Sequence, residues 1–241
     1  MPIEKFQKIM LKKIKFGFPI GPILDDAVDL FRRAGYDIKF YQEIEKVEIN
    51  DSEMECIPLR PISITSFVKK GILDAGIVTR ASLLELGVNN LKELVLLEDE
   101  KYILGRTKVV LAVPENSKIK SVKDLRGKKI ITRTPNITKK FLKKNKVSAD
   151  IVYSDTLVNE SKVGNIADAI VEFTKTGNIL RAYRLKVLDT ILESSIVLIA
   201  NKKSLKNKWK KEKIKNLVKV LKGALNQKFS DLMFRAPDLT G

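Results

Sequence analysis

The residues best suited to chemistry gather between Asn165 and Arg181. A predicted strand ends at Glu172, and a turn of hydroxyl-bearing residues and glycine follows it, Thr174-Lys175-Thr176-Gly177-Asn178. In such a turn several backbone N–H groups can point at one phosphate, while threonine hydroxyls and the start of a helix add donors and a favourable dipole. Glu172 can accept hydrogen bonds from ribose hydroxyls. The pattern predicts a site for a phosphorylated sugar, with an ordinary strand-to-helix turn as the alternative.

The sequence contains no histidine, which narrows the chemistry open to it. Without imidazole there is no Ser-His-Asp or Cys-His nucleophile, no histidine general base and no zinc site of the usual kind. The single cysteine, Cys56, cannot form a disulfide within the chain, so we expect a cytoplasmic protein. Any catalysis must come from carboxylates, Lys, Arg, hydroxyls or backbone groups.

The chain has 241 residues and a formal net charge of +17. Such a charge suits nucleic acid, an acidic membrane surface or small phosphorylated metabolites. No apolar run approaches the roughly 20 residues of a membrane span, and the first residues have no signal-peptide core, so we expect no membrane partner. The common nucleic-acid motifs are absent and Trp209 stands alone instead of in a set of stacking aromatics, so we expect no nucleic-acid partner.

The elements that position the loop alternate between strands and helices. Predicted strands cover residues 15–18, 75–78, 108–113, 129–132, 150–153, 169–173 and 195–200, with further strands in 37–59 joined by a turn at 50–52. Predicted helices cover residues 23–33, 64–70, 82–86, 137–144 and 204–227, and a capping box at Ser121 opens a shorter one. This alternation predicts an α/β fold with mixed, largely parallel sheets. We interpret the lysines of 204–227 as a solvated helix face.

Three segments carry a pattern that extends well beyond the loop. Residues 60–78 have the form R-P…G-x-x-D-x-G-I-[VT], and residues 127–141 have a form close to G-K-R-I-A-T-x-x-P-N-[LIV]-T-[RK]-[RK]-[YF]. Residues 167–180 match A-D-A-I-V-D-x-x-x-[ST]-G-x-T-L, except that Glu172 and Ile179 stand at the Asp and Thr positions. In these segments, and in their order from about Ile14 to Lys203, the chain resembles the ATP phosphoribosyltransferases that open histidine biosynthesis.

The resemblance implies a two-lobe scaffold like a type II periplasmic binding protein, with the active site in the cleft. The first lobe would hold residues 1–105 and 183–203, and the second residues 106–182. Residues 204–241 would form a lysine-rich helix and tail without a complete regulatory domain. The implied reaction is Mg²⁺-dependent: N1 of the ATP adenine displaces pyrophosphate from phosphoribosyl pyrophosphate. The implied partners are a regulatory subunit related to histidyl-tRNA synthetase and further copies of this chain.

The resemblance also assigns the site, and here the sequence departs from the family. Glu172 and the turn from Thr174 to Asn178 would bind phosphoribosyl pyrophosphate, and Arg60, Arg106 and Lys128 would bind ATP or other anionic groups. The early turn that reads P-K-G-R-L in the family lacks both of its cations in this chain, and other polar site positions are replaced as well. The substituted positions are Ile20, Pro22, Ser63, Ala81 and Ile179. Two hypotheses follow: a divergent active enzyme, or a site-degenerate paralogue that binds another anionic ligand or acts as a non-catalytic regulatory or assembly partner.

Overall fold

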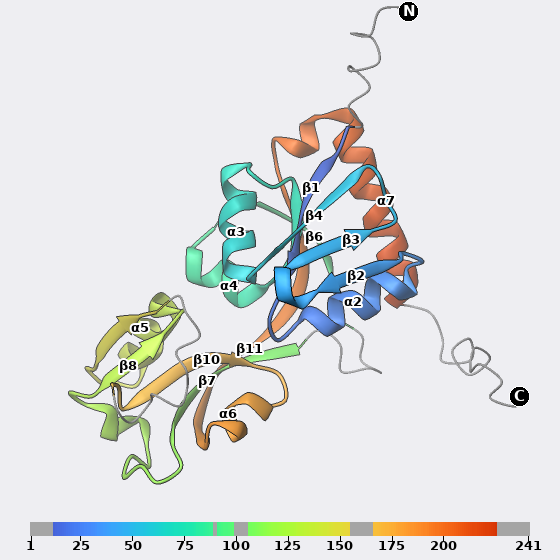
Figure 1. Cartoon of the computed structure of the whole chain (residues 1–241). Helices are drawn as coiled ribbons and strands as arrows, with labels where there is room; N and C mark the ends of the chain where they lie inside the picture. The colour runs from blue at the N-terminus through green and yellow to red at the C-terminus, as the bar shows by residue number, and fades with distance from the viewer. Residues whose placement is uncertain (1–11, 89–90, 99–105, 155–165, 226–241) are drawn as a thin grey trace, which may run out of the picture.

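The computed structural model describes residues 12–88, 91–98, 106–154 and 166–225, which form two α/β lobes (Figure 1). The strands of the first lobe are β1 (Ile14–Pro19), β2 (Ile38–Tyr41), β3 (Lys46–Ile49), β4 (Met54–Leu59), β5 (Ala75–Thr79) and β6 (Leu91–Leu96). Its helices are α2 (Leu24–Arg33), α3 (Pro61–Lys70), α4 (Arg80–Leu86) and α7 (Lys208–Leu225). The predicted opening of strand, turn and helix is confirmed.

The second lobe is built on β7 (Arg106–Pro114), β8 (Lys129–Thr132), β9 (Asp150–Tyr153) and β10 (Ala169–Thr174). Helices α5 (Pro135–Lys144) and α6 (Asn178–Ala182) belong to it. The capping box at Ser121 is present, and it opens a single 3-10 turn at Val122–Leu125. The residue boundaries that we predicted for the two lobes and for the tail stay predictions. Residues 99–105, next to the predicted boundary between the lobes, and residues 226–241 of the tail lie outside the described residues.

One strand, β11 (Leu185–Asn201), belongs to both sheets. Its first part pairs antiparallel with β7, and its last part pairs antiparallel with β5 and β6. On either side the sheet is parallel, with β4, β1 and β5 in the first lobe and β10, β8 and β9 in the second. The strand is therefore longer than the predicted 195–200, and it joins the lobes physically.

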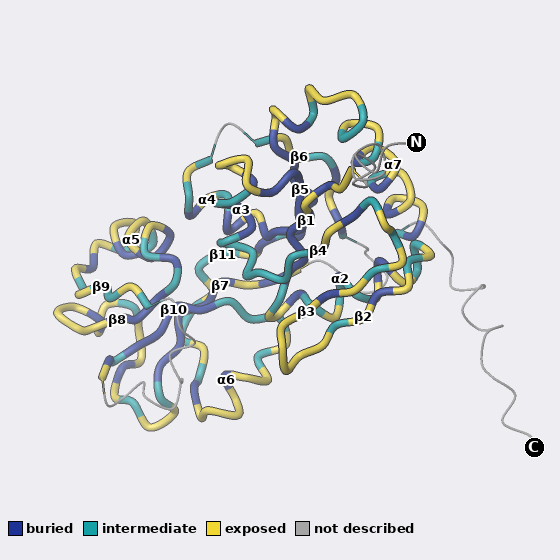
Figure 2. The backbone as a smooth tube through the Cα atoms, turned by 45° about the horizontal axis from the view of Figure 1, so that its top comes forward, coloured by how far each residue is buried: buried dark blue, intermediate teal, exposed yellow. Residues whose placement is uncertain are grey.

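The core of the first lobe forms where helices pack on the central strands, as the buried stretches in Figure 2 show. The Phe31 ring lies 5.8 Å from that of Phe16 and 5.3 Å from that of Phe18, so α2 packs directly on β1. A Cβ atom at Gly76 would lie 2.5 Å from Cγ2 of Ile64, so glycine lets α3 approach the sheet closely. Trp209 packs against the same core.

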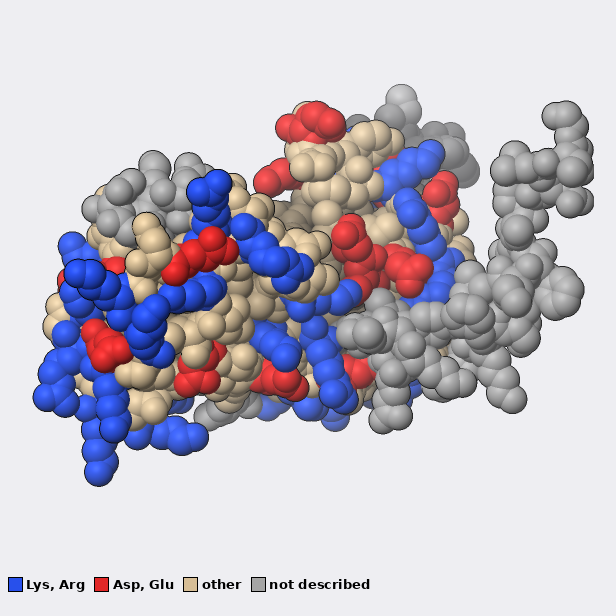
Figure 3. Space-filling view, turned by 90° about the horizontal axis from the view of Figure 1, so that it is seen from below, with Lys and Arg blue, Asp and Glu red and all other residues tan. Residues whose placement is uncertain are grey.

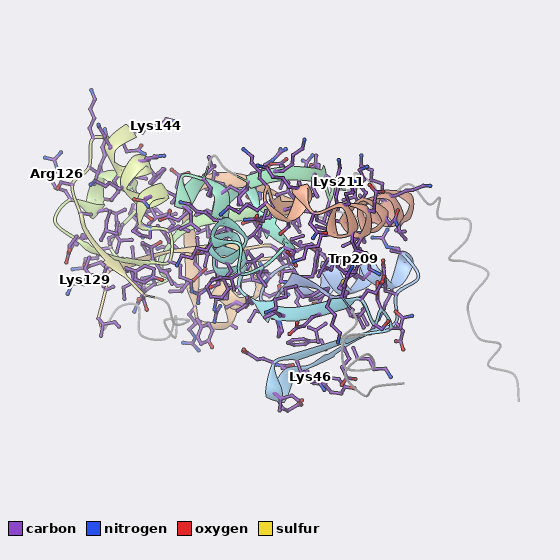
Figure 4. All side chains as sticks on the ribbon, turned by 90° about the horizontal axis from the view of Figure 1, so that it is seen from above. Lys46, Arg126, Lys129, Lys144, Trp209 and Lys211 are labelled. Atoms are coloured by element: carbon purple, nitrogen blue, oxygen red, sulfur yellow. The ribbon has the colours of Figure 1, made fainter. Side chains whose placement is uncertain are left out.

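Basic side chains are spread over both lobes and are interleaved with acidic ones on the face shown in Figure 3. In Figure 4, Arg126, Lys129 and Lys144 lie on the second lobe, while Lys211 lies on α7 and Lys46 on the β2–β3 hairpin. Helix α7 buries Ile214, Leu217 and Leu221 and exposes most of its lysines. A solvated face and an anion-binding patch both require such exposure, so the interpretation of these lysines stays a prediction. None of the helices in the described part of the chain has the length and apolar character of a membrane span.

Candidate active site

The loop after β10 takes its shape from one glycine and two threonines. Gly177 has φ 74°, a left-handed conformation that glycine adopts without strain, and α6 begins directly after it. The N–H of Gly177 donates to Oγ1 of Thr174 at 3.0 Å, and the N–H of Asn178 donates to Oγ1 of Thr176 at 3.4 Å. These two backbone N–H groups were expected to face a phosphate, but they donate to threonine hydroxyls of the loop itself. A phosphate that accepts from them must therefore replace these two hydrogen bonds.

The loop lines a cleft of about 650 Å³ that is open to solvent. Five of the six residues predicted to bind phosphoribosyl pyrophosphate line it: Glu172, Thr174, Lys175, Thr176 and Asn178. The remaining one, Gly177, lies between two of them. From the first lobe, the cleft is lined by Arg60, which precedes α3, and by Phe40, Gln42 and Glu45 around the β2–β3 hairpin. Residues of both lobes thus line the cleft.

Glu172 is held by Arg133, a residue that our reading of the sequence missed. Nη1 of Arg133 lies 3.2 Å from the carboxylate oxygens of Glu172, and the two side chains are only 11% and 8% exposed. Burial raises the pKa of Glu172, against the opposing effects of Arg133, the Phe173 backbone N–H and Arg60. The sequence held one usable signal: Arg133 follows β8, which is parallel to β10, so both strand ends reach the same edge of the sheet.

Lys175 forms an ion pair across the cleft. Its Nζ lies 2.5 Å from Oδ1 of Asp26, which stands in the first turn of α2 in the other lobe. The side chains of Lys175 and Asp26 are 25% and 11% exposed. The positive charge of the phosphate loop is thus partly compensated by a carboxylate of the facing wall.

Two predicted anion-binding residues do not line the cleft. Lys128 is exposed and lies 3.5 Å from Asp168, a residue whose carboxylate also accepts from the Lys129 N–H. Arg106 is exposed at the start of β7, where it pairs with Ser195 of β11. The structure brings Arg60 to the loop but neither of these residues, and their role in anion binding stays a prediction.

The positions that depart from the family pattern have clear places in the structure. Ile20 and Pro22 line the cleft and also a small apolar recess of about 40 Å³ beside it, which Arg60, Arg133 and Phe173 share. Ala81 is fully buried at the start of α4, and its N–H donates to Oγ of Ser194 at 2.8 Å. Ser63 lies half-buried on α3, and Ile179 is exposed at the rim of the cleft.

A second buried carboxylate joins the lobes behind the cleft. Glu85 of α4 accepts from the N–H groups of Asn136 and Ile137 at 2.9 Å each, in the first turn of α5. The side-chain amide of Asn136 donates in return to the backbone oxygen of Glu85 at 3.0 Å. A carboxylate at a helix N-terminus is favourable for the helix dipole. This contact fixes the helix that follows Arg133 against the first lobe.

No group of three or more acidic or cysteine side chains that could hold a metal occurs among the described residues. The carboxylate of Glu172 is engaged by Arg133, and that of Asp26 by Lys175. Mg²⁺ usually keeps several waters and takes one or two carboxylates together with substrate phosphates. The donor set here fits a magnesium ion whose oxygen ligands come mainly from a bound polyphosphate and water.

Two lobes joined by a shared strand, with a cleft between them, define the class of type II periplasmic-binding-protein-like scaffolds. The chain is similar in fold to the alkanesulfonate-binding protein SsuA from Xanthomonas axonopodis pv. citri, with a TM-score of 0.58 and 12% identity over 88% of this chain and 72% of that one. It is also similar to a chain of the "ATP phosphoribosyl transferase (HisG:HisZ) complex from Thermotoga maritima", with a TM-score of 0.65 and 21% identity over 89% of this chain and 100% of that one. The predicted fold class is confirmed.

Sequence similarity then assigns the family. A family model described as ATP phosphoribosyltransferase matches residues 60–223. The chain is 41% identical over 213 residues to a protein of that name from Chlorobium phaeobacteroides, which covers 88% of this chain and 72% of the relative. It is 38% identical over 214 residues to another from Thermodesulfovibrio yellowstonii, covering 89% and 73%. The chain belongs to the ATP phosphoribosyltransferase family, as the resemblance indicated.

Proposed function

We propose that this chain transfers the phosphoribosyl group of phosphoribosyl pyrophosphate to N1 of ATP and releases pyrophosphate, as in histidine biosynthesis. Family membership supports this activity. The observation that carries it within the structure is the meeting of Glu172 with Arg60, Arg133 and Lys175 in one cleft. A buried carboxylate suits ribose hydroxyls, and three cations suit a pyrophosphate.

The reaction asks the protein mainly for positioning. The nucleophile is a neutral ring nitrogen, so no strong base is needed, which agrees with a chain that has no histidine. Glu172 accepts hydrogen bonds from the ribose hydroxyls and holds the sugar still. Arg60 and Arg133 bind the departing pyrophosphate and stabilise the charge that develops on it. When bound with the pyrophosphate, Mg²⁺ adds further neutralisation of that charge.

The apolar recess beside the cleft marks the place where this chain lacks positive charge that the family pattern has. Ile20 and Pro22 stand where the family pattern has Lys and Arg. Arg60 belongs to the pattern itself, whereas Arg133 stands at a position that the pattern leaves open and adds a positive charge beside the altered turn. Charge-assisted hydrogen bonds contribute about 1.5–3 kcal/mol each, so Arg133 can compensate for part of the loss of the two cations. This supports the divergent active enzyme over the site-degenerate paralogue.

We also propose that the chain works in the cytoplasm and as part of an assembly. The neighbour from Thermotoga maritima is described as a complex of two kinds of subunit, which supports a regulatory subunit related to histidyl-tRNA synthetase for this chain. Further copies of the chain are the second proposed partner. Light scattering of the purified protein, alone and with such a subunit, measures both associations.

The test of the activity separates binding from chemistry. Titration calorimetry with phosphoribosyl pyrophosphate and Mg²⁺ is expected to show binding, and adding ATP is expected to yield phosphoribosyl-ATP. Lys175→Met should weaken binding, whereas Lys144→Met, a matched change of an exposed lysine on α5 that does not line the cleft, should leave it within about twofold, because exposed charges are screened. Absence of binding by the unaltered protein would refute the proposal, and binding without product would favour the paralogue.

A further inference from the structure

The ion pair between Lys175 and Asp26 needs an explanation beyond the binding of substrate. Lys175 is the only lysine among the described residues that line the cleft, and it lies in the middle of the phosphate loop. Its ammonium group is in contact with Oδ1 of Asp26 at 2.5 Å. The group placed to bind a phosphate is therefore already bound to an anion, and that anion belongs to the protein.

Stability does not explain the pair. Both side chains are largely removed from water, and the cost of desolvating two charges offsets most of the attraction between them. In addition, Oδ2 of Asp26 is buried and has no hydrogen-bond partner among the described residues. An unpartnered buried acceptor costs free energy. Among the described residues, Lys175 is the ion-pair partner of this carboxylate, and a competitor for that lysine would take its place.

We propose that Asp26 is an internal competitor for the phosphate loop and sets the affinity of the loop for polyphosphates. Its carboxylate occupies the place on Lys175 that a phosphate oxygen takes when ligand binds. A carboxylate carries one negative charge, whereas pyrophosphate carries several and can contact Arg60 and Arg133 at the same time. Pyrophosphate therefore displaces Asp26 readily, and an anion with a single charge does not.

The competition also links binding to the two lobes. Asp26 lies on α2 of the first lobe, and Lys175 follows β10 of the second, so the exchange of partners breaks one contact between the cleft walls. The contact of Glu85 with α5 lies on other elements and is unaffected by this exchange. The inference rests on the proposed function only in that it takes the ligand to be a polyphosphate.

The test uses inorganic pyrophosphate as the probe, with binding measured by titration calorimetry. Asp26→Asn keeps the shape of the side chain and removes its charge, and we expect it to bind pyrophosphate roughly tenfold more tightly, which corresponds to about 1.4 kcal/mol. The matched control is Asp29→Asn, a residue of the same helix whose side chain is 58% exposed and which does not line the cleft. It makes the same change in net charge and should alter affinity by less than about twofold, because exposed charges are screened.

The same substitution of Asp26 in a protein that lacks the lysine tests whether Asp26 acts through Lys175. In Lys175→Met, binding should be weaker, and adding Asp26→Asn should no longer improve it by the same factor. The same gain in the presence and absence of Lys175 would overturn the proposal, as would an equal gain from Asp29→Asn or weaker binding by Asp26→Asn. If the unaltered protein binds and Asp26→Asn binds no better, the competitor role is refuted while the proposed function stands. If neither protein binds, both are refuted.

Discussion

Replacing Arg133 by methionine should destabilise the protein in a way that depends on pH. The change keeps most of the apolar stem and removes the charge that faces Glu172, whose side chain is 8% exposed. Removing one partner of a buried ion pair costs about 3–5 kcal/mol. Because this pair borders an open cleft where water can enter, we expect the lower end of that range. For a chain of this size, such a loss lowers the melting temperature by roughly 6–12 °C.

The sign of the pH dependence follows from the pKa of Glu172. Burial raises that pKa, and Arg133 opposes the rise, so the pKa rises further in Arg133→Met. An acid whose pKa is raised on folding contributes stability that is fully present below its unfolded pKa, about 4.3, and is lost as pH rises through its folded pKa. The deficit of Arg133→Met should therefore be small near pH 4 and grow as the pH increases.

Urea unfolding of both proteins at several pH values measures this deficit directly. The double variant Arg133→Met with Glu172→Gln is the control, since it removes the titrating group and should abolish the growth of the deficit with pH. A deficit of the same size at every pH would show that the pair does not control the charge of Glu172, and would refute the electrostatic account of the site.

Three further outcomes are expected. Gly177→Ala should lower the free energy of unfolding by roughly 1–2 kcal/mol, because φ is 74° there, whereas Gly223→Ala within α7 should not; urea unfolding of each variant checks this. Burial raises the pKa of Cys56 to about 12, so a thiol reagent should label it at pH 8 only as fast as the protein opens; rapid labelling would contradict its buried position. Glu85→Ala should cost about 1–3 kcal/mol by depriving two α5 N–H groups of their acceptor, and calorimetric melting would show it.

The elements that the sequence predicts well are those whose signals are local. Helix α3 ends before Gly71, whose φ is 75°, as predicted. Its start at Pro61 lies three residues before the predicted residue 64, although proline at the first helical position is itself a local signal. The capping box at Ser121 is equally local, and its geometry is as expected. For these elements neighbouring residues decide the structure, and no distant partner is needed.

The elements that the sequence analysis missed depend on distant pairing. Strand β6 mixes polar and apolar residues and was not predicted, because what makes it a strand is its pairing with β11 about a hundred residues later. The first part of β11 is only half-buried, and its pairing with β7 extends it to Leu185. Long-range pairs of this kind leave little trace in local periodicity.

The residues of the candidate site also fall into two groups, those that local sequence predicts and those that only the fold brings together. Glu172 and the turn from Thr174 to Asn178 were predicted as a contiguous segment, and they line one wall of the cleft. Arg133 and Asp26 were not predicted, because their importance comes from contacts made across 39 and 149 positions of the chain. Tertiary structure alone brings these charges together.

The shared strand has a consequence for how the protein can be made. Strand β11 is the last strand of the described chain, yet β5, β6 and β7 all pair with it. Until β11 has emerged from the ribosome, it is missing from the sheets of both lobes. Strand β6 then has no partner, because β11 is the one described strand that pairs with it. Unpaired strand edges at that stage invite association with other chains. Both lobes must therefore complete their sheets in one late step of biosynthesis, after residues 185–201 have been released.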